Sequence, residues 1–446
     1  MSTTALVFLL LVFSGCVLAF LRHPIFGLYA YLVVFYVAPE NAWWSSEVPD
    51  VRWSLIVAIA TLIATLAHSA DRNRQPWFRG PGARPLIAFT VWLWIQLPWA
   101  LSFDDQLFIA SLFTKYLVLY AVMYRVLSDY QSIEGFGFAH ILGCFVWGLL
   151  AYQNPGSGRL EALGSGDVAG SAFASMQMST GLIFAGFAFI GFANWKRWIA
   201  LAAIPFIINA LILMVTRAAF IGLIAAAPIA YYLAPVRQRR FVLLSLVLGG
   251  VLGATLANDL FWSRISTIPG VGEAQQHMES SAASRIDIAT ANIRMFGDHP
   301  WGVGHRGNDI LSPKYMPSSL MASGEDKRSA HNTLMAVLVD HGLPGLLIFL
   351  CIHWSIARAV WGIKGYLNLI APSIRPFAAA LGPSLVAYWA NAQFANMTKS
   401  EIVLWIAVLA GAIKATVSST RGPAEKTAAR RSESCAEDGQ ATVRST

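Results

Sequence analysis

Hydrophobic residues run along this chain in long unbroken stretches that are separated by short polar segments. The stretches lie near residues 4–20, 25–43, 53–69, 85–101, 107–127, 136–152, 169–193, 197–214, 218–234, 240–258, 343–362, 376–393 and 402–417. A bilayer core requires about 20 apolar residues per helix, and continuous runs favour helices over the alternating pattern of a β-barrel. The pattern therefore predicts an all-α polytopic membrane protein with about 12–13 transmembrane helices.

The composition supports a membrane protein and argues against two other classes. Hydrophobic residues make up 56% of the chain and charged residues only 13%, against about 25% in soluble proteins. The net charge of +8 does not indicate nucleic-acid binding, because the basic residues cluster in short inter-helix loops and in the C-terminal segment. The four cysteines show no metal-binding or disulfide spacing. We therefore expect the lipid bilayer as a partner and no nucleic acid.

The charges of the loops predict the orientation. The segment 69–84 contains four arginines and one aspartate, and the loops at 194–198 and 234–240 are also basic. Basic loops stay on the cytoplasmic side of a membrane. The loops between them are neutral or acidic, so the N-terminus is expected outside and the C-terminus inside. The first apolar run lacks a basic segment before it, so we expect it to be a retained helix rather than a signal peptide.

The longest polar segment separates the chain into four expected parts. Residues 1–257 are predicted to carry the first ten transmembrane helices, and residues 258–342 to form a periplasmic loop. Residues 343–417 carry the remaining transmembrane helices, and residues 418–446 form a disordered cytoplasmic tail. A loop as long as 258–342 is usually functional or disordered.

This loop has the pattern of two short helices. In the first, one helical face is expected to be apolar and to lie on the membrane surface, with Ser284 as the N-cap. That face consists of Ile286, Ala289, Ile293 and Phe296. The second is predicted from His331 to Val339 with Ser329 as its N-cap. A break at Gly342, Pro344 and Gly345 then precedes a spanning helix that starts near Leu343.

A few charged residues on the predicted outer side suggest a site. They are Arg159, Arg217, Arg285 and His331. Each has a structural explanation: an arginine that reaches the phosphate headgroups, a solvated helix face, or a polar residue at a helix start. Taken together, guanidinium groups suit a phosphate or pyrophosphate, and histidine is the usual general base near neutral pH. Lys115 is expected to be buried in mid-helix, in a packing role.

Some motifs are absent from the sequence. It has no Asp-x-Asp, no phosphate-cradling Gly-rich loop with Lys, no His-Glu-x-x-His and no Gly-x-Ser-x-Gly. Neither a metal site nor an ATP site is therefore predicted, and no cofactor is expected.

Two motifs resemble the bacterial O-antigen ligase and polymerase family. They are DHPWGVG at 298–304 and HNTLMAVLVDHGLPG at 331–345, and they follow an arginine-containing helix. The segment Met214–Ala219 resembles the family's Ser-Arg element with Thr216 in place of serine, and 158–160 resembles its outer-loop arginine. The N-terminal segment is similar to the exosortase-associated O-glycosylation ligase branch. The resemblance covers about residues 155–350.

The resemblance implies a chemistry for the outer site. Members transfer a glycan from undecaprenyl pyrophosphate to an acceptor hydroxyl, such as that of lipid A-core, on the periplasmic face, without metal or ATP. His331 would deprotonate the acceptor hydroxyl, Arg217 and Arg285 would hold the pyrophosphate, and Arg159 would assist. Asn332 would orient the acceptor or the histidine. Three residues of the HP-x-G-x-G motif would have supporting roles: His299, Gly302 and Gly304.

Two alternatives remain at this point. A polymerase would use the same donor and accept the growing chain instead of a different acceptor. A transporter of lipid-linked glycans is a function of another class. Transporters often carry inverted repeats and polar residues near the midplane, whereas the notable polar residues here gather toward one face.

Overall fold

The structure is a computed structural model of the 446-residue chain. It describes residues 1–68, 76–155, 160, 170–234, 236–256, 275–316 and 327–418. The side chains of residues 237, 253, 256 and 275–285 are outside the described part.

The described residues form helices and no strands, which confirms the predicted all-α fold. The helices are α1 (Thr3–Leu21), α2 (Ile25–Val37), α3 (Trp53–Ala67), α4 (Ala83–Ile95), α5 (Phe103–Val126), α6 (Tyr130–Gln153), α7 (Ser171–Gly191), α8 (Lys196–Met214), α9 (Arg217–Leu233), α10 (Arg239–Leu256), α12 (Gln275–Asp298), α13 (Gly307–Tyr315), α14 (Thr333–Gly362) and α15 (Arg375–Ala392). The C-terminal helix Ile402–Ser418 follows. Short 3₁₀ turns occupy Pro39–Asn41, Ser45–Glu47, Trp77–Arg79, Leu97–Trp99, Val236–Gln238 and Ile363–Leu369.

Within the described residues, six helices are long and apolar enough to cross a membrane. They are α1, α5, α6, α7, α8 and the segment Thr333–Leu369 that contains α14. Four shorter apolar helices accompany them: Ile25–Asn41, Trp53–Ala67, Arg217–Leu233 and Ile402–Ser418. The chain is a multi-pass membrane protein. The sidedness and the division into four parts remain predictions, and the tail from residue 419 lies outside the described residues.

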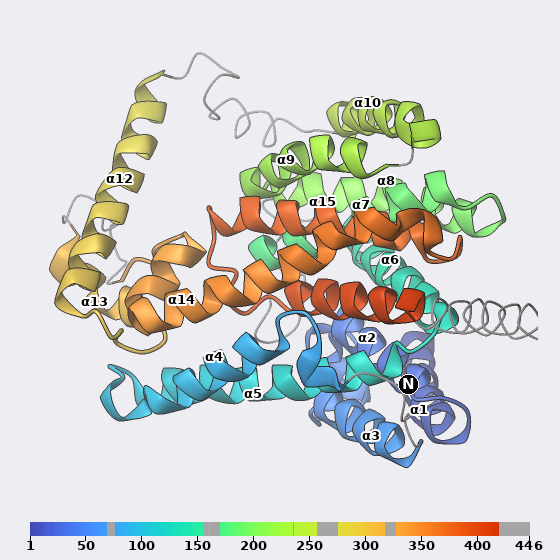
Figure 1. Ribbon diagram of the computed structural model, residues 1–446, viewed down its shortest axis with the longest axis horizontal. Coiled ribbons are helices and arrows are strands. Elements are labelled where there is room, and N and C mark those ends of the chain that lie inside the picture. The colour runs from blue at the N-terminus through green and yellow to red at the C-terminus, as the bar shows by residue number, and fades with distance from the viewer. Residues whose placement is uncertain are drawn as a thin grey trace, which may run out of the picture.

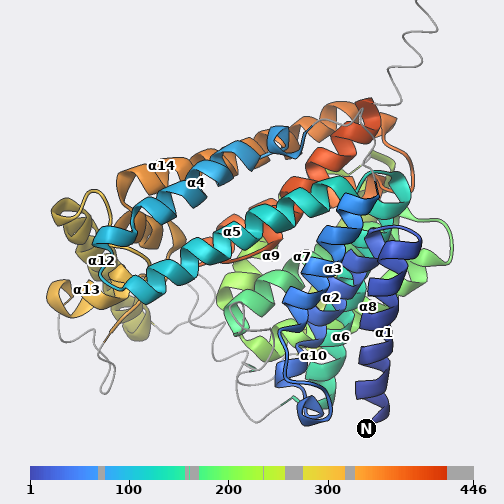
Figure 2. The same ribbon diagram turned by 90° about the horizontal axis from the view of Figure 1, so that it is seen from below.

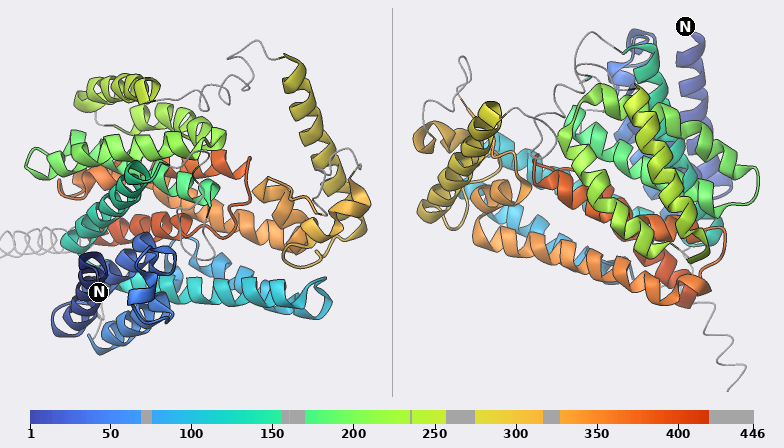
Figure 3. Two further views of the ribbon diagram at one scale, coloured as in Figure 1. Left: turned by 180° about the vertical axis from the view of Figure 1, so that it is seen from behind. Right: turned by 90° about the horizontal axis from the view of Figure 1, so that it is seen from above.

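The helices form a bundle from which one group projects (Figure 1). Helices α6 to α9 and α15 pack together, and α1 to α3 stand beside them. Helices α4, α5 and α14 run side by side and extend past the bundle toward α12 and α13, as Figure 2 shows. Figure 3 shows α10 at the edge of the bundle, away from α4 and α5. We call the end of the molecule that carries α12, α13 and the beginning of α14 the α12 end.

Local sequence features explain the helix starts and the close packing. Ser102 caps α5 by accepting a hydrogen bond from Asp105 N (3.3 Å), and Asp129 caps α6 through Ser132 N (2.9 Å). Glycine lets helices approach each other: a Cβ at Gly148 would lie 2.6 Å from the backbone of Phe206 on α8. Such small residues allow tight packing where lipid gives no hydrophobic driving force between helices.

Lys115 differs from its prediction. It lies in the middle of α5 as expected, but its side chain is exposed rather than buried. It shares the outward face of α5 with Leu107 and Val118, which are also exposed. The hydrophobic run around Lys115 predicts a buried side chain, whereas in the structure Lys115 lies on a helix face that points away from the bundle.

Candidate functional site

His331 and Asn332 form the head of α14 at the α12 end. His331 is exposed and has a positive φ of 47°, which is uncommon outside glycine. Asn332 is the N-cap: its Oδ1 accepts hydrogen bonds from Leu334 N (2.9 Å) and Met335 N (3.1 Å). The predicted N-cap Ser329 is therefore wrong, and the helix begins at Thr333 rather than His331. Asparagine competes better for this position because its short amide reaches two N–H groups.

The loop after α15 anchors this head. Asn332 Nδ2 donates to Gln393 Oε1 (3.2 Å) and lies 3.4 Å from Gln393 O. Thr333 Oγ1 donates to Ala395 O (2.8 Å) and accepts from Met397 N (2.9 Å). The backbone that follows His331 is thus held by hydrogen bonds to residues about sixty positions later in the chain.

Arg217 begins α9 after a tight turn. Helix α8 ends at Met214, Val215 has a φ of 47°, and Thr216 makes no side-chain cap for α9. The Arg217 side chain, directly after this turn, is half-buried. The N–H groups at a helix start favour an anion, and an arginine there adds to this preference.

Arg159 lies outside the described residues, but its neighbour Leu160 is described. Leu160 N donates to Leu213 O (3.1 Å), at the end of α8. The backbone that follows Arg159 is therefore fixed close to the turn that precedes Arg217.

Helix α15 connects the surroundings of Arg217 with those of His331. A Cβ added to Gly222 on α9 would lie 2.6 Å from Asn391 Nδ2 on α15. Two residues after Asn391, Gln393 contacts Asn332. Because Gly222 lies only about one and a half turns after Arg217, the structure places Arg217 and His331 toward the same end of the bundle.

Arg285 lies in α12, and its side chain is outside the described part. One prediction about this helix is wrong. It begins at Gln275, so Ser284 is inside the helix and does not cap its start. The buried face consists of Ile288, Ala291 and Met295, which pack with Val339 of α14.

The predicted apolar face of α12 points away from the rest of the protein. Ile286 is 67% exposed and Ile293 57% exposed. The helix therefore has two apolar stripes. The stripe that packs on α14 also has helical spacing, so the sequence alone did not show which of the two stripes faces the protein. The expected position of the other stripe on a membrane surface remains a prediction.

The glycines of the 298–304 motif dock on the break in α14. Gly302 (φ 81°) and Gly342 (φ 69°) face each other so closely that a Cβ on either would overlap the backbone of the other. Leu343 N donates to Pro300 O (2.9 Å), and Gly304 N (φ 90° at Gly304) donates to Asp340 O (2.8 Å). The predicted break at Gly342 is confirmed, and the loop 298–304 packs against it.

His299 stands apart from this docking. Its N–H donates to Met295 O (3.0 Å) at the end of α12, and its side chain is half-buried. Gly302 and Gly304 have a structural reason for their positions, whereas the contacts that the structure gives His299 show no role for its ring.

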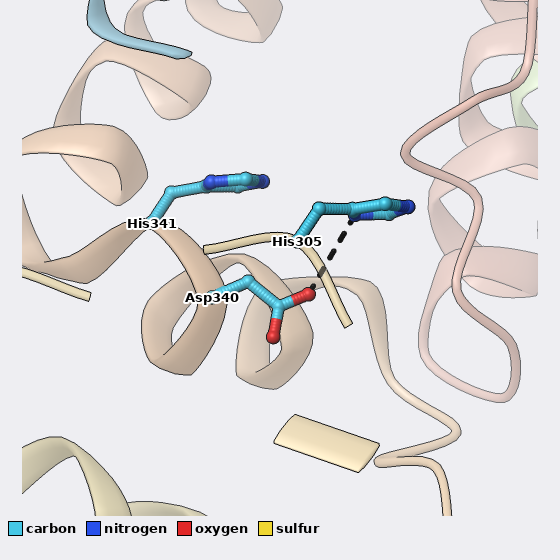
Figure 4. Close-up of side chains that lie close together, drawn as sticks. All are labelled: His305, Asp340 and His341. Carbon is cyan, nitrogen blue, oxygen red and sulfur yellow. Dashed lines mark ion pairs between the residues drawn. The ribbon is translucent and has the colours of Figure 1, made fainter. Parts of the chain in front are cut away.

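Three side chains that the sequence reading did not place in the site converge beneath this loop (Figure 4): His305, Asp340 and His341. All three are buried. Asp340 Oδ1 accepts from Asn308 N (2.8 Å) and Oδ2 from Arg306 N (3.1 Å), while His305 Nδ1 lies 3.8 Å from Oδ2. The dipeptide Asp340-His341 was visible in the sequence, but its partner His305 lies 35 positions before Asp340, and only the fold joins them.

Helices α4 and α5 hold this cluster from the other side. Gln106 Oε1 accepts from His305 N (2.7 Å), and His341 Nδ1 lies 2.8 Å from Gln96 Oε1. Burial and, to a smaller extent, the positive charges of Lys399 and Arg306 lower the pKa of His305 to about 3. His305 is therefore neutral near pH 7, and its approach to Asp340 is not an ion pair.

Ligand atoms of His305, Asp340 and His341 all lie within 4.8 Å of one another, which is a spacing that could hold a metal ion. Imidazole nitrogen and carboxylate oxygen are zinc ligands. The cluster is distinct from His331, because Asp340 lies seven positions after the first residue of α14, or about 10 Å along the helix axis.

Comparison with known proteins addresses the predicted resemblance. No curated protein sequence gives a significant match to this chain. A protein-family model does match, over residues 202–350, and that range contains Arg217, the glycine motif, the cluster and His331. This match does not distinguish the exosortase-associated branch, which remains a prediction. Residues 202–350 match the family described as O-antigen ligase, and the resemblance predicted from the sequence is thereby confirmed.

Proposed function

We propose that this protein transfers a glycan from undecaprenyl pyrophosphate to an acceptor hydroxyl on the periplasmic face of the inner membrane. The family match supports membrane glycan transfer of the O-antigen ligase type. The observation that carries the assignment of the site is the strained, exposed His331, which the Asn332 cap and Gln393 hold in place. A non-glycine residue with positive φ at an over-determined position indicates a functional constraint.

In the proposed reaction, the His331 side chain accepts the proton of the acceptor hydroxyl. The acceptor oxygen forms a bond to the anomeric carbon of the glycan, and the bond from that carbon to the pyrophosphate oxygen breaks. Arg217, Arg285 and Arg159 bind the pyrophosphate and stabilise the charge that develops on it. The leaving pyrophosphate supplies the driving force, so neither ATP nor a metal takes part in the chemical step.

Three features support the anion site. Arg217 lies at an α-helix start without a side-chain cap, where a negative charge is favoured. Leu160, next to Arg159, is bonded to the end of α8 just before that start. Helix α15 links this region to Asn332 and thus to His331.

The test is glycan transfer by the purified protein in detergent, with lipid-pyrophosphate-linked glycan as the donor. Both a lipid A-core acceptor and the lipid-linked glycan itself are offered, so that ligation and polymerisation give different products. His331→Gln should lower the transfer rate by about 10²–10⁴-fold, because a general base contributes about that much. Donor binding should be unchanged.

His68→Gln is the matched control, since His68 lies at the end of α3 and bonds Ala64 O (2.9 Å) within its own helix. It should keep normal transfer. Near-normal transfer by His331→Gln would overturn the assignment of the base. Absence of transfer by the wild type, with movement of the lipid-linked glycan across vesicles, would favour a transporter.

A further inference from the structure

The hydrogen bonds around His341 fix which of its nitrogens carries the proton. Gln96 Nε2 donates to Trp301 O (3.2 Å) and to Asp340 O (3.3 Å), so Gln96 Oε1 must be the acceptor in its contact with His341. His341 Nδ1 therefore carries the hydrogen, and Nε2 has a lone pair. Figure 4 shows the tip of this ring directed at His305.

Asp340 Oδ2 and His305 Nδ1 face the same space. Asp340 Oδ2 is a carboxyl oxygen that already accepts from Arg306 N, and a second lone pair remains. His305 Nδ1 faces this oxygen at 3.8 Å, which is too long for a hydrogen bond. Among the described residues, no side chain donates a hydrogen bond into the space between the three.

We propose that His305, Asp340 and His341 form a site for a divalent transition-metal ion of the zinc type, which fastens the loop after α12 to the break in α14. Two imidazoles and one carboxylate are ligands that suit zinc. The outer contacts have the arrangement usual around such sites: Gln96 fixes the tautomer of His341, and Asn308 N holds the second oxygen of Asp340.

Two positive charges lie near the cluster, and the side chains that carry them make contacts of their own. Arg306 directs its guanidinium away from the cluster toward Asp105 (3.6 Å) and Asp309 (3.5 Å). Lys399 reaches the ring of Phe108 (5.5 Å) on α5. Bonds to zinc of about 2.0–2.1 Å require the three ligand atoms to move inward, by about 1 Å at most, through small side-chain rotations.

The proposal does not depend on the proposed glycan transfer, and its test does not use activity. The full-length protein, purified in detergent with an affinity tag free of histidine, is stripped with a chelator and equilibrated with Zn²⁺ or Co²⁺. After desalting, elemental analysis should find about one ion per chain. Co²⁺ should give the visible absorption of a tetrahedral nitrogen and oxygen site.

Three variants test the assignment of the ligands. His305→Gln and His341→Gln should each weaken binding by more than tenfold, and Gln96→Leu by about tenfold. His353→Gln is the control, because His353 is a buried histidine of the same helix that bonds Phe349 O (2.9 Å) instead. It should bind metal as the wild type does.

Two outcomes would overturn the proposal. One is a wild-type protein that binds neither ion, which would mean that water or a proton satisfies the three acceptors. The other is metal binding that survives in both histidine variants. If those variants fail to fold, the wild-type stoichiometry and Co²⁺ spectrum still decide.

Discussion

Two histidine clusters are buried in the described part of this chain, and their hydrogen bonds are arranged in opposite ways. In the bundle, Gln177 Nε2 donates to Tyr36 Oη (2.9 Å), which lies 2.6 Å from His140 Nδ1. His140 Nε2 lies 3.2 Å from Thr180 Oγ1, and Thr180 in turn donates to Gln177 O (2.8 Å). Each donor in this cluster meets an acceptor.

At the α12 end, by contrast, none of the hydrogen bonds within the described residues joins His305, Asp340 or His341 to another of the three, although they lie close together. A buried polar group without a partner costs roughly 1–3 kcal/mol, so the network around His140 is satisfied as it stands, whereas a shared ligand would join the three side chains at the α12 end. The comparison shows that burial alone does not distinguish a histidine with a structural role from one with a ligand-binding role. The hydrogen-bond partners around the histidine are more informative about its role.

The largest expected effect comes from a substitution that disrupts the loop docking beside His305, Asp340 and His341 and leaves the cluster around His140 intact. Gly342→Ala places a Cβ against the backbone of Trp301 and Gly302 at a φ of 69°. We expect thermal unfolding in detergent to show a loss of about 3 kcal/mol or more, together with loss of metal binding.

Gly186→Ala is the control for this glycine. It lies in the interior of α7 with no atom within 4 Å of the added Cβ. It should leave stability unchanged or raise it by at most about 1 kcal/mol, because alanine favours helix. Equal stability of the two variants would show that the loop does not dock on the break as described.

A smaller effect is expected from breaking the complete cluster. Tyr36→Phe removes the hydroxyl that lies between Gln177 and His140, so two buried polar groups lose a partner. The variant should lose about 1–3 kcal/mol of stability, by the same amount with and without zinc. His341→Gln should differ from the wild type mainly when zinc is present. A zinc-dependent cost for Tyr36→Phe would remove the distinction between the clusters.

The fold followed closely from the sequence because hydrophobic runs directly report helices in a membrane. The predicted stretch 197–214 became α8 (Lys196–Met214), and 376–393 became α15 (Arg375–Ala392). The break at Gly342 was predicted from glycine and proline. The caps were predicted less well, since Ser329 and Asn332 are both good N-caps and only the contact with Gln393 selects one.

The residues of the proposed transfer site lie in sequence motifs and were predicted. The cluster of His305, Asp340 and His341 is brought together by the fold and was not. His331 and Asn332 are adjacent, and the glycines lie within one short loop. Gln96, His305 and His341 come from three separate segments, and no local sequence spacing predicts their contact. Their polar groups are informative only once burial shows which atoms have partners.

The smallest effect is expected where polar contacts are neither deeply buried nor incomplete, beside His331. Gln393→Ala removes the Oε1 acceptor of Asn332 Nδ2 but keeps the backbone oxygen of residue 393. Because Asn332 is half-exposed, stability should hardly change. The head of α14 would be held less firmly, so kcat for glycan transfer should fall by about 3–10-fold, corresponding to roughly one hydrogen bond, while KM for the donor stays constant.

Gln393→Glu restores the acceptor and should recover most of the rate, which a role in packing alone would not predict. If Gln393→Ala instead lowers stability without changing kcat, the role of Gln393 is structural only. The contact at Asn332 would then resemble the complete cluster around His140, and the strained backbone of His331 would need another support.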